Sequence, residues 1–194
     1  MARSWLTRTL AALGLAAVSA GAAGAQVFTP TYMSPRMTND IGVYVGDSPR
    51  DPGDLAIEGI WRGGPLGLRV GFADGPDDAL LVGGEFRNPI PLAGAPFGLA
   101  FTAGIQAAIG DADALGFQAG LTAGHTFLSP GFAFTPYIHP RIAFINGFGG
   151  DDELDLEVLA DVGFDLGIAP NLILRFGANL GEGADWGFGF AWRR

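Results

Sequence analysis

The residues of this chain best suited to acid–base chemistry are its two histidines, His125 and His139. Histidine transfers protons near neutral pH when a nucleophile or an activated water lies within hydrogen-bond reach. Tyr137 and Arg141 flank His139 at alternate positions, but no serine shares its segment, and serine is scarce beyond residue 25. We therefore predict no catalytic residue and no enzyme, and we read His139 as a hydrogen-bonded structural residue.

Charged residues recur at alternate positions along short segments with apolar residues between them. Because a β-strand sends successive side chains to opposite faces, such charges share one face of a strand. Across the chain this face carries Glu58, Arg62, Arg69, Glu85, Arg87, His139, Arg141, Asp155, Glu157, Asp161, Asp165 and Arg175. Buried charges must be paired or hydrated, so the pattern predicts a charge network inside an enclosed lumen.

The acids of segment 154–168 have two interpretations within that network. In the first, they pair with Arg141 and Arg175 on the two neighbouring strands, and the network fills and closes the lumen. In the second, water reaches Asp155, Glu157, Asp161 and Asp165, and these acids attract cations into a narrow passage. The second reading draws on the glycine-rich segments 97–106, 115–127 and 185–192, which leave space opposite the charged residues.

Clustered acids between the segments are weak candidates for calcium, which prefers carboxylate oxygens. The candidates are Asp74, Asp77, Asp78, Asp151, Asp152 and Glu153. Neither cluster has the ligand spacing of a calcium-binding loop, and solvated loops explain them more simply. We therefore predict no metal site and no cofactor.

Ten segments alternate between an apolar face and a face of small or polar residues. They are 41–46, 55–62, 66–73, 80–87, 97–106, 115–127, 132–145, 154–168, 172–180 and 185–192. Segment 97–106 has roughly the 9–11 residues with which a tilted strand crosses a bilayer. Pro136 and Pro140 fall on the apolar face of the seventh segment. Proline donates no hydrogen bond to a ladder, so we expect this strand to be bulged or frayed.

Acidic and uncharged connections alternate between these segments. The first, third, fifth, seventh and ninth are acidic, and the four even ones carry no charge. Alternate connections of an up-and-down barrel lie at the same end, so one rim is predicted to be acidic and the other neutral. We expect an all-β, up-and-down antiparallel transmembrane β-barrel with ten strands. Eight strands is the alternative if segment 41–46 and one weak neighbour are not strands.

The first 25 residues read as a secretory signal peptide. Arg3 and Arg8 precede an apolar run at 10–20, and Ala23-Gly24-Ala25 fits a cleavage site. The run is shorter than the about 20 residues of a transmembrane helix. Residues 26–39, which include Pro30 and Pro35, are expected to form an extended periplasmic lead-in, and residues 40–194 the barrel.

Composition narrows the function classes. The formal net charge is −9, with no lysine, so nucleic acid is excluded as a partner because phosphate binding needs a basic face. Hydrophobic residues make up 48% and the mean hydropathy is +0.30, although no run after the signal peptide is long enough for a spanning helix. A water-facing strand surface rich in lysine and glutamate is missing, which disfavours a soluble barrel.

The last segment resembles a known assembly signal. Asp185, Gly187, Phe190 and Trp192 occupy the polar, glycine, hydrophobic and aromatic positions of the C-terminal motif of bacterial outer-membrane barrels, although Arg193 and Arg194 follow here. With the signal peptide and the strands, the chain resembles the small outer-membrane β-barrel (porin-like) proteins.

This resemblance implies a location and a set of partners. It implies export to the Gram-negative outer membrane, recognition by the barrel assembly machinery, and surroundings of lipid and lipopolysaccharide. We expect a structural role or a narrow passive, cation-preferring passage. A secreted soluble β-barrel that binds a small ligand is the alternative, and an outer-membrane hydrolase is the third reading.

Overall fold

The computed structural model describes residues 27–49, 53–75, 78–110, 113–147, 154–180 and 186–194. Its strands are β1 (Asp40–Asp47), β2 (Leu55–Gly63), β3 (Leu66–Ala73), β4 (Ala79–Ile90), β5 (Gly98–Gly110), β6 (Ala114–Gly124), β7 (Phe127–Ser129), β8 (Phe132–Gly147), β9 (Leu154–Ala169), β10 (Leu172–Leu180) and β11 (Trp186–Arg193). No helix in the described ranges is long and apolar enough to cross a membrane.

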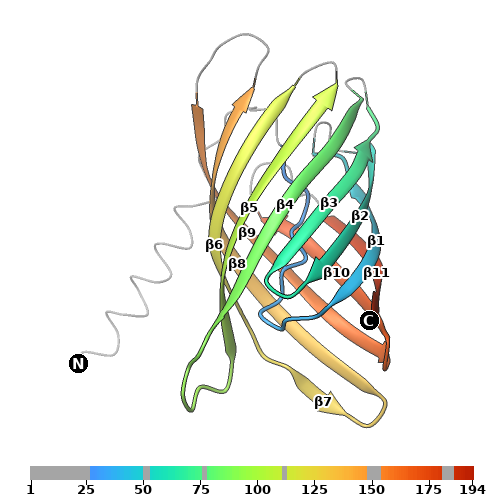
Figure 1. Cartoon of the computed structure of the whole chain (residues 1–194), viewed down its shortest axis with the longest axis vertical. Helices are drawn as coiled ribbons and strands as arrows, with labels where there is room; N and C mark the ends of the chain where they lie inside the picture. The colour runs from blue at the N-terminus through green and yellow to red at the C-terminus, as the bar shows by residue number, and fades with distance from the viewer. Residues whose placement is uncertain (1–26, 50–52, 76–77, 111–112, 148–153, 181–185) are drawn as a thin grey trace, which may run out of the picture.

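Ten of these strands form a closed antiparallel barrel (Figure 1). Consecutive strands pair from β1 to β6 and from β8 to β11, β6 pairs with β8, and β1 pairs with β11 to close the sheet. The register between the first and last strands runs from Asp40 opposite Arg193 to Gly46 opposite Gly187. The predicted up-and-down barrel of ten strands is confirmed, and the eight-strand alternative is wrong.

The predicted sixth strand is divided into β6 and β7. Beyond Gly124 the chain no longer pairs with β5, and β7 pairs only with β8 as an extension of the hairpin. The His125 N–H donates to the Pro136 carbonyl, but Pro136 has no N–H to donate in return. The ladder is therefore interrupted between the two parts.

The strand that carries the two prolines, predicted to be bulged or frayed, contains no bulge in its pairing with β9. β8 is continuous over its 16 residues, and its register with β9 does not shift. The prolines act on the other side, where the pairing with β6 omits Leu121 and Thr122 but resumes in the same register at Ala123. A missing donor thus removes ladder pairs without displacing the strand.

The two faces of the sheet differ sharply in polarity. On β3, Leu68 and Val70 are 62% and 56% exposed on the outside, whereas Arg69 between them is 4% exposed on the inside. The same alternation runs through the other strands, so the exterior is a continuous apolar surface and the interior is charged. Four phenylalanines form a row across the exterior of β7 to β10: Phe127, Phe134, Phe164 and Phe176.

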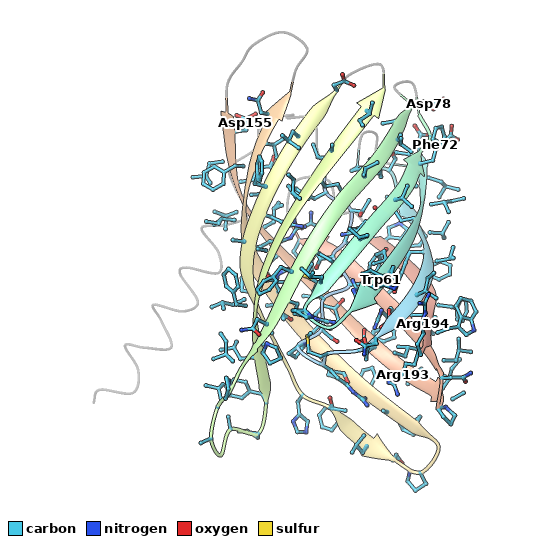
Figure 2. The ribbon with its side chains drawn as sticks, in the orientation of Figure 1. Trp61, Phe72, Asp78, Asp155, Arg193 and Arg194 are labelled. Carbon is cyan, nitrogen blue, oxygen red and sulfur yellow. The ribbon has the colours of Figure 1, made fainter. Side chains whose placement is uncertain are left out.

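The two ends of the barrel also differ. Asp78 and Asp155 lie at one end with Phe72 near them, whereas Arg193 and Arg194 lie toward the other end (Figure 2). Described acids of the first end are Asp47, Asp54, Asp74, Asp78, Asp113 and Asp155. We call this the acidic end and the other the arginine end.

Candidate functional site: the charged barrel interior

Buried ion pairs join strands of the barrel on the inner face of the wall. Arg62 of β2 pairs with Glu85 of β4 across the intervening strand. Arg69 of β3 pairs with Glu58 of β2, with Nη2 2.7 Å from Oε2. Arg141 Nη2 of β8 lies 2.9 Å from Asp161 Oδ1 of β9. Since each pair is drawn from wall residues, the strands neutralise their own interior charge.

Arg175 on β10 is the most connected of these side chains. Its guanidinium donates to Asp40 at 3.0 and 2.8 Å, to Asp165 at 3.2 Å and to the Tyr44 hydroxyl at 2.8 Å. Such multiple, charge-assisted bonding is the arrangement to which the planar guanidinium is suited. The sequence analysis missed Asp40, although its position on the inward face at the start of β1 could have identified it.

The structure brings together all but two of the twelve predicted interior residues. Glu58, Arg62, Arg69, Glu85, Arg87, His139, Arg141, Asp161, Asp165 and Arg175 are buried inside the barrel. Asp155 is exposed at the acidic end, and Glu157 is half-buried. The pairing of the β9 acids with Arg141 and Arg175 occurs at Asp161 and Asp165, which lie deep in the barrel.

Residues 27–39, which we call the interior segment, do not form the predicted periplasmic lead-in. They are extended and belong to no strand, but they lie within the barrel rather than before it (Figure 1). Val27 and Phe28 pack in an apolar cluster with Ala73, Ala79 and Ala114, at the strand ends nearest the acidic end. The segment then runs through the interior to β1, which starts at the arginine end. The space inside the glycine-rich strands is thus occupied by the chain itself.

Hydroxyl groups of the interior segment bond to the acids of the wall. Thr29 donates to Glu58 at 2.7 Å, Thr31 donates to Asp161, and Ser34 donates to Asp165 at 2.7 Å. Each of these acids also holds an arginine, so the hydroxyl occupies acceptor capacity that the ion pair leaves free.

Backbone carbonyls of the interior segment bond to the arginines. Arg69 donates to the Pro30 carbonyl at 3.0 Å, Arg62 to the Thr31 carbonyl at 3.0 Å, and Arg87 to the Ser34 carbonyl. An extended chain has no internal ladder to satisfy these carbonyls, so the arginines perform that task. Side chains of the wall therefore hold the interior segment in place by hydrogen bonds to its hydroxyl and carbonyl groups.

Glycines of the wall make room for the larger side chains of the interior segment. A Cβ on Gly187 would overlap the Tyr32 hydroxyl, and a Cβ on Gly116 would overlap the Phe28 ring. Gly177 lies against Pro30 and Tyr32. The predicted assembly-signal residue Gly187 thus has a packing role as well, whereas Phe190 and Trp192 point outward and Asp185 lies outside the described residues.

His139 occupies the centre of a hydrogen-bonded group. Its Nε2 lies 2.7 Å from the Thr102 hydroxyl, and its Nδ1 lies 2.8 Å from the Thr31 hydroxyl and 3.3 Å from Asp161. A hydroxyl, a histidine and a carboxylate in this order are the parts of a nucleophilic triad. However, Thr102, His139 and Asp161 are each at most 2% exposed, and Thr31 occupies the space beside the imidazole. The hydrogen bonds of His139 therefore hold the interior segment against β5, β8 and β9.

The weak calcium candidates do not converge in the described part of the chain. No group of three or more histidine, aspartate or glutamate side chains suited to a metal ion occurs there. Asp78 instead accepts a hydrogen bond from the Gly75 N–H at 3.2 Å, which stabilises its own turn. Asp77, Asp151, Asp152 and Glu153 lie outside the described residues.

Two buried threonines provide a test of these contacts. Thr31 and Thr122 are both 0% exposed, but the Thr31 hydroxyl bonds Asp161 whereas the Thr122 hydroxyl has no partner among the described residues. We expect Thr31→Val to destabilise the fold by about 1–3 kcal/mol, because a buried carboxylate loses a donor. Thr122→Val should be close to neutral. Unfolding in detergent, followed by tryptophan fluorescence, measures both, and equal effects would contradict the assigned role of Thr31.

Fold and interior together define a closed antiparallel β-barrel with an apolar exterior and a charged lumen that holds residues 27–39 of the same chain. Neither the scan against protein-family models nor the search of curated proteins finds a match for this chain.

Proposed function

We propose that this protein is an outer-membrane β-barrel of a Gram-negative bacterium, with a structural role and a lumen that is closed at rest. The observation that carries the proposal is the reversed polarity of the barrel. Large apolar side chains cover its exterior, while ten charged or histidine side chains predicted to face inward are buried inside it. A barrel dissolved in water gains nothing from this arrangement, whereas lipid favours it.

Aromatic side chains near both ends of the barrel are consistent with the two interfaces of a bilayer. Trp61 and Trp192 flank Ile41 in register near the arginine end, and Phe72 and Trp186 lie near the acidic end. Aromatic side chains form girdles at both membrane interfaces of outer-membrane barrels, and tryptophan suits the interface because its large apolar ring carries a polar N–H. Closure by β1 and β11 also leaves no sheet edge, which the hydrocarbon region requires.

The partners follow from this location. Lipid and lipopolysaccharide would cover the apolar exterior, and the barrel assembly machinery would recognise the last strand. On β11, Phe190 and Trp192 are exposed on the outer face, where another protein can contact them during assembly. The alternative of a soluble barrel that binds a small ligand would require an apolar interior, but the interior is charged and occupied.

Fractionation of native cells tests the proposal. We expect the protein in the outer-membrane fraction, soluble only with detergent, with an unboiled band that migrates differently from the boiled band. Closed barrels resist detergent until heated because every backbone group is bonded to a neighbouring strand. A freely soluble protein without a heat-dependent band would contradict the proposal.

A further inference from the structure

We propose that this barrel is a latent channel: withdrawal of the interior segment opens a water-filled passage that prefers small cations. This inference rests on the proposed membrane location and goes beyond the closed, structural state. It identifies residues 27–39 as the element that closes the lumen. It also identifies the wall residues that would line the passage.

The first support is that the interior segment is separable from the sheet. None of its residues belongs to a strand, and its hydrogen bonds to the barrel strands each involve at least one side chain. Asn39, at the end of the segment next to β1, also accepts a backbone hydrogen bond from Arg194, which follows β11. The ten-stranded ladder closes without it. Removal of the segment therefore breaks no backbone pairing of the barrel.

The second support is that the wall keeps its ion pairs when the interior segment leaves. Glu58 retains Arg69, Asp161 retains Arg141, and Asp165 retains Arg175. Arg62 retains Glu85. Since removing one partner of a buried ion pair is the expensive event, loss of hydroxyl and carbonyl contacts is the smaller cost. Water that enters the lumen can replace those contacts.

The third support is the space that the segment occupies. An extended chain fills a column of roughly 5 by 10 Å, judged from the spacings of neighbouring strands and stacked sheets. Gly116, Gly177 and Gly187 have no side chains to fill the positions of Phe28, Pro30 and Tyr32. Withdrawal thus leaves a column wide enough for water and small ions.

The charge distribution sets the ion preference. Arginines and acids of the wall are nearly balanced, so the wall itself favours neither sign strongly. The described acids of the acidic end concentrate cations at that mouth. They are Asp47, Asp54, Asp74, Asp78, Asp113 and Asp155. We therefore expect cation preference that weakens at high salt, because exposed charges are screened.

Recordings in planar lipid bilayers test the proposal with a deletion of residues 27–38. The full-length protein should give no current steps, whereas the deletion variant should give discrete steps with a reversal potential shifted toward that of K⁺ in a KCl gradient. A synthetic peptide of residues 27–39 should abolish the steps. A peptide with valine in place of Thr29 and Thr31 should block less well.

A substitution in the full chain gives a second, independent route. Gly187→Leu should displace Tyr32 and produce steps, because its side chain would occupy the position of the tyrosine ring. Gly59→Leu is the matched control, since Gly59 lies on the outward face with only the Val70 carbonyl oxygen near a new Cβ, at 3.7 Å. This control should remain closed.

Three results would overturn the inference. They are current steps in the full-length protein equal to those of the deletion variant, a deletion variant that inserts but stays silent, and a deletion variant that cannot form a barrel. The last would show that the wall depends on the interior segment. Failure of the proposed membrane location is a different result, in which the full-length protein needs no detergent and has no heat-dependent band.

Discussion

Arg175→Met is expected to abolish or strongly destabilise the folded barrel. Arg175 is 0% exposed and is the shared partner of Asp40 and Asp165, which lie on different strands, β1 and β9. Methionine has a similar volume but no charge, so two buried carboxylates would lose their cation. Removing one partner of a buried pair costs about 3–5 kcal/mol, and here the loss is shared by two acids.

The measurement is the temperature at which the unboiled gel band of the detergent-extracted protein converts to the unfolded band. We expect a decrease on the order of 10 °C, given the enthalpy typical of a domain of this size. The unfolding temperature of Arg175→Lys should lie between those of the unchanged protein and Arg175→Met, because lysine keeps the charge but cannot bridge both carboxylates. Arg194→Met, at an exposed arginine, is the control, and an equal effect there would contradict the role assigned to Arg175.

Asp161→Ala should have the second-largest effect, on both stability and closure. Asp161 holds Arg141 at 2.9 Å, lies 3.3 Å from His139, and accepts the hydroxyl and the backbone N–H of Thr31. The substitution leaves the buried Arg141 without a counter-charge, at a cost of about 3–5 kcal/mol. It also removes two bonds that hold the middle of the interior segment.

Asp155→Ala is the matched control, because Asp155 lies on the same strand and the same face but is exposed at the acidic end. It should leave the unfolding temperature unchanged. The double variant Asp161→Leu and Arg141→Leu should be less destabilised than Asp161→Ala, since it leaves no unpaired charge. Additive losses in the double variant would argue against the coupling of these two side chains.

The hydrogen-bonded group around His139 is enclosed by the interior segment. Thr102, His139 and Asp161 have the spacing of a hydroxyl–imidazole–carboxylate relay. A catalytic relay needs space for a substrate beside the nucleophile. Here the interior segment fills that space and Thr31 bonds the imidazole directly, so the three side chains anchor a buried peptide.

The strands were predictable because their information is local. Period-two alternation in segments such as 66–73 and 172–180 assigns each side chain to a face without reference to distant residues. A barrel of these segments must place all charges on one side, so the burial of Arg69, Asp161 and Arg175 followed from parity. The sorting of acidic connections likewise depends only on their order along the chain.

The sequence by itself determined the alternation of the strands, the polarity of each face and the acidic end of the barrel, whereas the structure decided between ten and eight strands. Only the tertiary structure decided which acids of β9 pair with Arg141 and Arg175, which partners the other arginines take, and what fills the lumen. Arg62 reaches Glu85 across β3, and Arg175 reaches Asp40 across β11, because tilt and closure set these distances. The interior segment has no periodicity that marks it as buried. Its hydroxyl and carbonyl groups bond to the wall residues only once the barrel has closed around them. Those wall residues lie far away in the sequence, so no local sequence pattern predicts the contacts.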